Sequence, residues 1–255
     1  LLLAASGLLL GACADEAPDV EDQAELGFKA APLWTNGNFE IGTHNQAPPN
    51  WTIRSYSNPN IANTNPQTFS QLGLTNMSTT TNLRTWLRTA AGGEGSVTDG
   101  NAPNIKWPRY GNGVAVLDVL TGAVANSMEQ TMTLTVDDID PADGKLHIRF
   151  AVAPILEDPG HSAVQQPYWY VELVNVTRSI TLYRDFNYAN QPGVPWQGTS
   201  AKYTNWQLVD IAPTSVQAQL GDQIRLLVVA AGCSPTGHWA RVYVDGVGPK
   251  VPSLF

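Results

Sequence analysis

The sequence predicts an all-β protein built as an antiparallel β-sandwich, and three observations lead to this prediction. Apolar and polar residues alternate with a period of two in nine short segments, as they do along strands with one buried face. Turn-forming residues separate these segments, with 22 Gly and 18 Pro among 255 residues. No stretch of a dozen residues carries the 3.6-residue apolar stripe of an amphipathic helix, so a long helix bundle is excluded.

The expected strands follow one another from Trp51 toward the C-terminus. They are 51–56 (WTIRSY), 113–120 (GVAVLDVL), 127–136 (SMEQTMTLTV), 145–155 (KLHIRFAVAPI), 168–176 (YWYVELVNV), 179–186 (SITLYRDF), 206–211 (WQLVDI), 223–231 (QIRLLVVAA) and 238–247 (HWARVYVDGV). The turn chemistry agrees, because Pro141-Ala142-Asp143-Gly144 separates two of these segments.

The segment before the second of these strands is less regular. NLRTWLRTA (82–90) is a candidate for one or two helical turns. Within 57–113, SNPNIANTNPQT (57–68) and AAGGEGSVTDGNAPN (90–104) are expected to form long loops, and loops of that length in a compact domain are usually functional or mobile.

Charge is sparse and unevenly distributed. Charged residues make up 14% of the chain, and the net charge is −8. No basic stripe is present to release counterions from phosphates, which argues against nucleic acid as a partner. Six acids lie in residues 13–30, which we interpret as a disordered, solvated tether, while residues 29–255 carry 16 acids against 14 Lys and Arg. The acidic pI is therefore a property of the tether.

The N-terminal residues 1–12, LLLAASGLLLGA, form an apolar run too short to span a bilayer. The run lacks Met and a basic beginning, so we interpret it as a truncated signal peptide. Leu10-Gly11-Ala12-Cys13 resembles the lipobox of bacterial lipoproteins. This resemblance implies that Cys13 is acylated and that an exported protein is anchored to a bacterial membrane, exposed at the cell surface, through this lipid alone. An ordinary secretory segment with a chance cysteine is the alternative.

Several motifs in the body resemble a known family. TNGNFEIG (35–42), followed by Asn50-Trp51-Thr52, resembles the opening strand of bacterial jelly-roll domains related to carbohydrate-binding modules, and RVYVDGV (241–247) resembles their closing strand. Residues 166–196 and 230–248 are similar to an N-terminal module of myxobacterial-type surface lipoproteins that precedes arrays of immunoglobulin-like repeats. The resemblance implies a jelly roll over residues 31–248, with 249–255 as the start of a linker to a further C-terminal region.

The same resemblance implies a structural Ca²⁺. In the modules that this chain resembles, a glutamate of the first strand and an aspartate of the last share the ion. Those positions are Glu40 and Asp245 here, with Asn38 as a further oxygen ligand. Gly246 follows Asp245 where the family often has a second aspartate, so one carboxylate is missing. The alternative is that both acids are solvated residues at strand ends.

Aromatic residues indicate a polysaccharide ligand, since the chain has eight Trp and eight Tyr and sugar rings stack on aromatic planes. Strand alternation places Tyr168, Tyr170 and Glu172 opposite a set that begins with Trp169 and is expected in the core. The same alternation applies to 239–243, and Trp196 lies in a loop rich in Pro and Gly. Aromatic packing within the core is the alternative. The expected ligand-binding residues are Trp196, Tyr168, Tyr170, Glu172, Arg149, Trp239, Arg241 and Tyr243.

No catalytic residue is assigned, because the common hydrolase, protease and nucleotide-binding motifs are missing. Glu157, Asp158 and His161 share one loop and are the best candidates for acid–base chemistry. No Cys/His metal cluster is expected. Cys233 is expected to be a small buried apolar residue, with a disulfide to Cys13 as the alternative.

The function predicted from the sequence is therefore that of a non-catalytic cell-surface lipoprotein module. Its partner is expected to be a polysaccharide or another extracellular polymer. A structural or adhesive stalk domain that contacts other proteins is the second candidate, and a glycan-active hydrolase is the third.

Overall fold

A computed structural model describes residues 34–250, apart from 62, 78–82, 91–96, 121 and 236. The predicted signal peptide (1–12), the predicted lipidation site Cys13, the predicted tether (13–30) and most of the predicted C-terminal linker (249–255) lie outside these residues. Among the residues that are described, no helix is long and apolar enough to cross a membrane.

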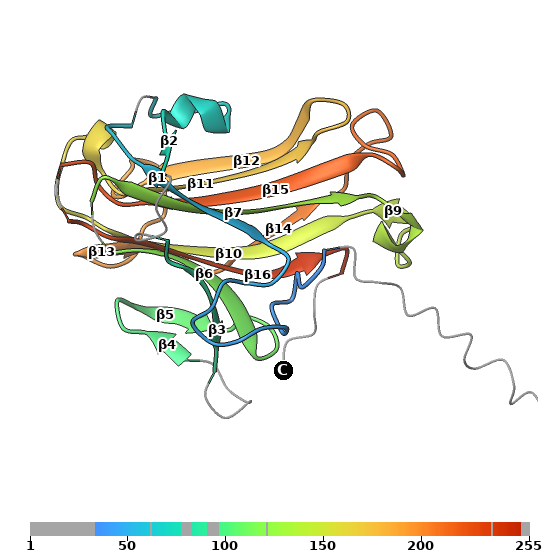
Figure 1. Cartoon of the computed structure of the whole chain (residues 1–255), viewed down its shortest axis with the longest axis horizontal. Helices are drawn as coiled ribbons and strands as arrows, with labels where there is room; N and C mark the ends of the chain where they lie inside the picture. The colour runs from blue at the N-terminus through green and yellow to red at the C-terminus, as the bar shows by residue number, and fades with distance from the viewer. Residues whose placement is uncertain are drawn as a thin grey trace, which may run out of the picture. The chain divides into compact units, whose positions relative to one another are not determined.

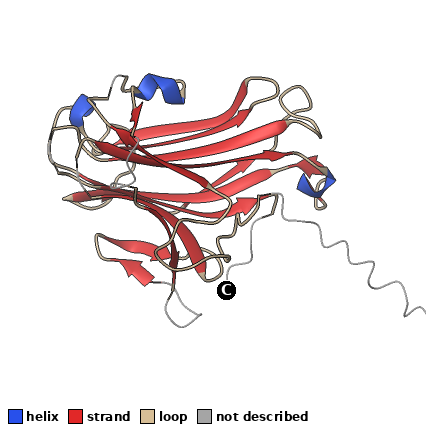
Figure 2. Cartoon of the chain, viewed as in Figure 1, coloured by secondary structure: helices blue, strands red, loops and turns tan. Residues whose placement is uncertain are grey.

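Two antiparallel sheets face each other in the described part of the chain (Figures 1 and 2). The first sheet has the strand order β12-β11-β15-β7-β1-β2, and the second has the order β13-β10-β16-β6-β3, with β14 also paired to β10. The first sheet consists of β1 (Thr52–Ser57), β2 (Thr75–Asn76), β7 (Val124–Thr133), β11 (Tyr168–Asn175), β12 (Ile180–Tyr188) and β15 (Gln223–Ala231). The second consists of β3 (Thr85–Thr89), β6 (Gly113–Val119), β10 (Ile148–Glu157), β13 (Ala201–Tyr203), β14 (Gln207–Ile211) and β16 (Ala240–Gly248).

Two hairpins and three single-turn helices complete the described elements. They are the hairpin of β4 (Val97–Asp99) and β5 (Ala102–Trp107), the hairpin of β8 (Ile139–Asp140) and β9 (Lys145–Leu146), and the 3₁₀ turns η1 (Phe69–Leu72), η2 (Val136–Asp138) and η3 (Ala163–Gln165). The chain passes between the sheets at β2 to β3, β6 to β7, β7 to β10, β10 to β11, β12 to β13, β14 to β15 and β15 to β16. These crossings make the sandwich a jelly roll, and the predicted fold class is confirmed.

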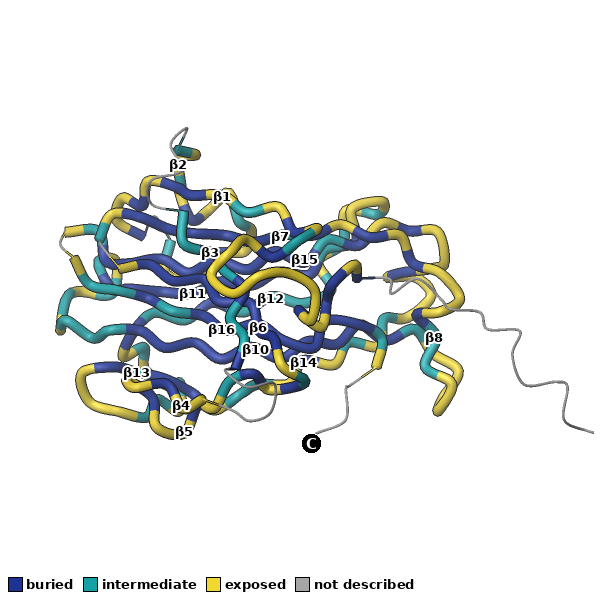
Figure 3. Tube along the Cα trace, turned by 60° about the horizontal axis from the view of Figure 1, so that its bottom comes forward, coloured by how far each residue is buried: buried dark blue, intermediate teal, exposed yellow. Residues whose placement is uncertain are grey.

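Strand alternation builds the main core between the sheets. Trp169, Val171 and Leu173 of β11 point inward and are fully buried, and they share one apolar cluster with Val242 and Val244 of β16. Burying side chains of this size stabilises the fold by roughly 1.5–3 kcal/mol each before conformational entropy is counted. Figure 3 shows the buried residues running along the centres of the strands.

Each sheet also carries a covered outer face. The segment that contains η1 packs Ile61 and Leu72 onto the outer face of the first sheet, against Tyr168 and Tyr170. The β4–β5 hairpin places Ala102 and Ile105 on the outer face of the second sheet (Figure 1). Both coverings come from residues 57–113. The described residues of 58–68 lie outside helices and strands, as expected, but the second expected loop, 90–104, contains β4 and the start of β5.

The prediction of one or two helical turns at 82–90 is also wrong, because this segment contains β3. Thr85, Leu87 and Thr89 alternate with Trp86 and Arg88, and Leu87 is fully buried, so a period of two fits these residues better than a helical stripe.

The expected opening strand (35–42) is a series of turns. Asn36 has φ 58° and Phe39 has φ 55°, which are left-handed values incompatible with a strand. The Asn36 side chain holds this turn by accepting from the Ile41 amide at 2.9 Å and donating to the Ile41 carbonyl at 2.9 Å. At Gly37, a Cβ atom would lie 2.1 Å from the Val247 carbonyl oxygen, so only glycine allows the turn to approach β16.

Candidate functional site

Half-buried tryptophans gather on the outer face of the second sheet. Trp86 lies on β3, Trp107 ends β5, and Trp206 and Trp239 directly precede β14 and β16. All four border one apolar cluster that contains the buried Tyr243. We call these four tryptophans with Tyr243 the aromatic face.

Ring contacts hold the aromatic face together. Tyr243 stacks on Trp107 with ring centroids 6.0 Å apart and an interplanar angle of 18°, and its ring lies 6.3 Å from that of Trp206. The Trp206 indole N–H donates to the Lys106 carbonyl at 2.8 Å. Hairpin β4–β5 and the entry to β14 are therefore fixed against β16.

Charged side chains surround these rings. The guanidinium of Arg241 donates to Asp99 at 2.7 Å and to Asp118 at 3.2 Å, and it lies 5.7 Å from the Trp239 ring. Burial alone would lower the pKa of Arg241, but attraction to Asp118 and Asp99 outweighs it and raises that pKa. Arg84 lies 4.2 Å above the Trp86 ring. Arginine planes beside aromatic rings offer both stacking and hydrogen-bond donors to a polar ligand.

The predicted set at 239–243 projects to this outer face, while Ala240, Val242 and Val244 enter the main core. Trp239 is half-buried and remains a ligand candidate, and Arg241 is partly exposed but paired. Tyr243 is only 3% exposed, and its hydroxyl donates to Asp99 at 2.8 Å. The expectation that Tyr243 contacts a ligand directly is therefore wrong.

Tyr168, Tyr170 and Glu172 also project outward as expected, but the covering of the first sheet buries all three. The Tyr170 hydroxyl donates to Glu172 at 2.6 Å, and Glu172 pairs with Arg225. A ring with no exposed surface cannot stack on a sugar, so these three predicted binding residues are structural.

Arg149 and Trp196 are likewise not open platforms. Arg149 is buried and donates to Asp140 at 2.6 Å and to Asp210 at 2.8 Å. Trp196 packs against the main core even though it lies in a loop. Sequence alternation could not show that Asp140 and Asp210 take up the hydrogen-bond donors of Arg149. Nor could it show that the loop carrying Trp196 packs against the core.

The proposed metal ligands Glu40 and Asp245 meet at a single loop, residues 109–113. Glu40 accepts from the amides of Asn112 at 2.7 Å and Gly113 at 3.0 Å. Asp245 accepts from the amides of Arg109 at 2.8 Å and Tyr110 at 2.9 Å.

The environment of Asp245 disfavours its charged form. Burial, with a smaller contribution from the charge of Glu40, raises the pKa of Asp245 to about 8 despite these amide hydrogen bonds. The third proposed ligand, Asn38, lies exposed on the adjoining turn.

The carboxylates of the candidate acid–base loop accept hydrogen bonds from neighbouring parts of the protein. Glu157 accepts from the Trp239 amide at 3.0 Å, and Asp158 accepts from the Gly160 amide and from Gln166, both at 3.1 Å. These carboxylates therefore brace the loop that carries His161.

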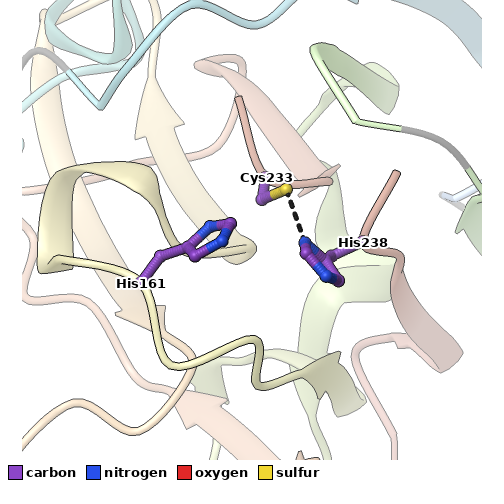
Figure 4. A group of neighbouring side chains, drawn as sticks. All are labelled: His161, Cys233 and His238. Atoms are coloured by element: carbon purple, nitrogen blue, oxygen red, sulfur yellow. Dashed lines mark hydrogen bonds between the residues drawn. The ribbon is translucent and has the colours of Figure 1, made fainter. Parts of the chain in front are cut away.

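His161, Cys233 and His238 lie together, contrary to the expectation that no Cys/His cluster forms (Figure 4). The Cys233 sulfur lies 3.0 Å from Nδ1 of His238, and the two imidazole rings are 5.0 Å apart at 79°. Sequence spacing missed this cluster because His161 is 72 residues before Cys233 and comes from the other sheet's strand end.

No protein-family model matches this sequence, and no curated protein is significantly similar to it. Among solved structures, a Stig cyclase, Fisc, from Fischerella sp. TAU is similar at 14% identity and a TM-score of 0.38, over 84% of this chain and 96% of that one. A CBM27 module from Caldicellulosiruptor saccharolyticus in complex with mannohexaose is similar at 11% identity and a TM-score of 0.33, over 64% and 90%. A CBM28 module specific for non-crystalline cellulose is similar at 14% identity and a TM-score of 0.33, over 62% and 89%. Likenesses this distant assign neither a ligand nor an activity to this chain.

Proposed function

We propose that this protein is a non-catalytic module that binds a polysaccharide through the aromatic face. The observation that carries the proposal is the gathering of four half-buried indoles on one side of the second sheet. Indole planes stack on the C–H faces of sugar rings, and Arg84, Arg88 and Arg241 beside them supply donors for sugar hydroxyls.

The charged groups at this face favour binding over bond cleavage. Asp99 and Asp118 both pair with Arg241, and their side chains are 1% and 3% exposed. A general acid must reach the glycosidic oxygen, and neither carboxyl is placed at the surface to do so. Stacking on a solvated face should give an affinity of roughly micromolar to millimolar.

Loss of a half-buried indole should weaken glycan binding. We expect Trp239→Ala and Trp86→Ala each to weaken retention by about tenfold or more, a change of about 1.4 kcal/mol. Affinity electrophoresis across soluble and insoluble glycans measures this, with the melting temperature recorded for each variant. Trp196→Phe is the matched control, because Trp196 packs against the main core and is not part of the aromatic face.

Two outcomes would contradict the glycan proposal. Failure of every glycan to retard the wild type would favour the stalk function, in which the aromatic face contacts protein. Release of reducing ends by the wild type would indicate a hydrolase.

We also propose that the module is held at a bacterial cell surface through acylated Cys13, which lies outside the described residues. The lipobox resemblance of Leu10-Gly11-Ala12-Cys13 supports this proposal. Metabolic labelling of the full chain with a palmitate analogue should mark the wild type but not Cys13→Ala, because the other cysteine of the sequence, Cys233, is fully buried. Equal labelling of both would contradict lipidation at this cysteine.

A structural Ca²⁺ at Glu40 and Asp245 is a further proposal. The two carboxylates supply the hard oxygen ligands that Ca²⁺ prefers, and a cation would offset the repulsion between them. Calcium at a hundredfold excess over its dissociation constant should stabilise the fold by about 2.7 kcal/mol. Chelation should therefore lower the melting temperature by several degrees, and Glu40→Gln should abolish the difference. An unchanged wild-type melting temperature, or the same shift in Glu40→Gln, would exclude the site.

A further inference from the structure

Two segments far apart in the sequence bring three potential ligand atoms together (Figure 4). His161 lies in the loop after β10. Cys233 lies two residues after the end of β15, and His238 lies two residues before the start of β16. One ring nitrogen of each histidine and the cysteine sulfur all lie within 4.8 Å of one another.

The backbone fixes where these side chains start. The Cys233 amide donates to the His238 carbonyl at 3.2 Å, and the Cys233 carbonyl accepts from the Ala123 amide at 2.7 Å. The His161 carbonyl accepts from the Gln166 side chain at 3.1 Å. A site whose ligand backbones are already held loses little entropy when an ion binds.

Burial and polarity also favour an ion. Cys233 is fully buried and both histidines are half-buried. The Nδ1 atom of His161 is buried and has no hydrogen-bond partner among the described residues. A buried polar atom without a partner costs about 1–3 kcal/mol, which coordination to an ion would offset.

We propose that His161, Cys233 and His238 bind a thiophilic transition-metal ion, with Zn²⁺ as the expected occupant. Thiolate and imidazole are ligands for zinc and its neighbours, whereas calcium and magnesium take oxygen. The Cys233 thiol gives up its proton to solvent when the sulfur–zinc bond forms, and both imidazoles bind as neutral ligands. Tetrahedral zinc needs its sulfur and nitrogen ligands about 3.6 Å apart. The 3.0 Å approach of Cys233 to His238 therefore needs to widen by only a few tenths of an ångström.

Three protein ligands leave the fourth tetrahedral position open to water or to a ligand from solution, in contrast to zinc sites closed by four protein ligands. His238 directly precedes Trp239 of the aromatic face in the sequence. The zinc test is therefore read out on metal binding alone, so its outcome does not depend on whether a glycan binds.

The test loads the full chain with Zn²⁺ and, separately, with Co²⁺ as a spectroscopic probe. We expect about one bound ion per chain after removal of unbound metal, a thiolate-to-cobalt charge-transfer band, and release of about one proton on binding near neutral pH. Cys233→Ser should lose the charge-transfer band. His161→Gln and His238→Gln should bind Zn²⁺ at least about tenfold more weakly.

Matched controls isolate the three ligands. Cys13→Ser changes the other cysteine, and His44→Gln changes an exposed histidine that contacts Thr89; neither should alter the band or the affinity. His161→Gln changes a loop residue, so its melting temperature should match that of the wild type even if Cys233→Ser folds poorly.

Three results would overturn the zinc proposal. They are the absence of a thiolate band in the wild type, its persistence in Cys233→Ser, and wild-type affinity in His161→Gln. Rapid alkylation of Cys233 by iodoacetamide at pH 6, unaffected by added Zn²⁺, would indicate a thiolate–imidazole pair instead of a metal site.

Discussion

Asp99→Ala should destabilise the protein by about 3–5 kcal/mol, because it removes the buried acceptor that joins hairpin β4–β5 to β16. In the wild type, Asp99 accepts from Arg241 at 2.7 Å and from the Tyr243 hydroxyl at 2.8 Å, and its side chain is 1% exposed. In the variant, Arg241 keeps its ion pair with Asp118 but loses the one with Asp99, and the buried Tyr243 hydroxyl loses its acceptor. Urea unfolding measures the loss.

Arg54→Ala is the matched control for Asp99→Ala. Arg54 pairs with Glu129, but its side chain is 42% exposed, so the loss should stay below about 1 kcal/mol. Asp99→Asn keeps an acceptor and should fall between the two. A loss in Asp99→Ala no larger than that in Arg54→Ala would show that the ion pair does not hold the hairpin.

The free energy of unfolding of the wild type, measured relative to that of Asp138→Asn, should fall by up to about 3 kcal/mol as the pH rises from about 4 to about 6. Above about pH 6 the difference should stay constant. Burial raises the pKa of Asp138 from 3.8 to about 6, against an opposing hydrogen bond from Thr135, and nearby Asp137 adds to the rise. The folded chain therefore keeps a proton that the unfolded chain has already lost. The free energy of unfolding falls as pH rises through this window.

The comparison with Asp138→Asn is needed because other groups titrate as well. Hydrogen bonds and ion pairs lower the pKa values of Asp140, Asp143 and Asp210, which makes the fold lose stability in acid. The amide side chain of the Asp138→Asn variant cannot titrate, so subtracting the variant's curve removes those shared contributions. Parallel curves for the two proteins, measured by urea unfolding at each pH, would contradict the raised pKa.

Strand alternation predicted which side chains enter the main core but not whether the opposite face is open. Trp169 and Val171 were expected inward and are buried there, while Tyr168 and Tyr170 were expected outward and lie under Ile61 and Leu72. A period of two assigns a face to each residue. What covers that face depends on contacts between segments that are distant in sequence.

The aromatic face was only partly predictable for the same reason. Trp239 was expected there from alternation along β16, whereas Trp86 lay in a segment interpreted as helical. Arg84, Trp86 and Arg88 do recur at every second position, and that signal was present in the sequence. Trp107 joins them only because β4–β5 folds onto the second sheet. The His161, Cys233 and His238 cluster had no local signal at all.

The strand order has a consequence for how the chain acquires its structure. β15 and β16, the last two described strands, occupy interior positions in the first and second sheets, and Val247 of β16 bonds to Gly37 at the other end of the described chain. Until both strands leave the ribosome, β11 and β7 lack the strand that joins them, and so do β10 and β6. Folding of the sandwich can therefore be completed only once β16 has been synthesised. It should take milliseconds to seconds, as is typical of sandwiches in which strands distant in sequence pair, so the incomplete sheets expose unpaired strand edges until β15 and β16 add.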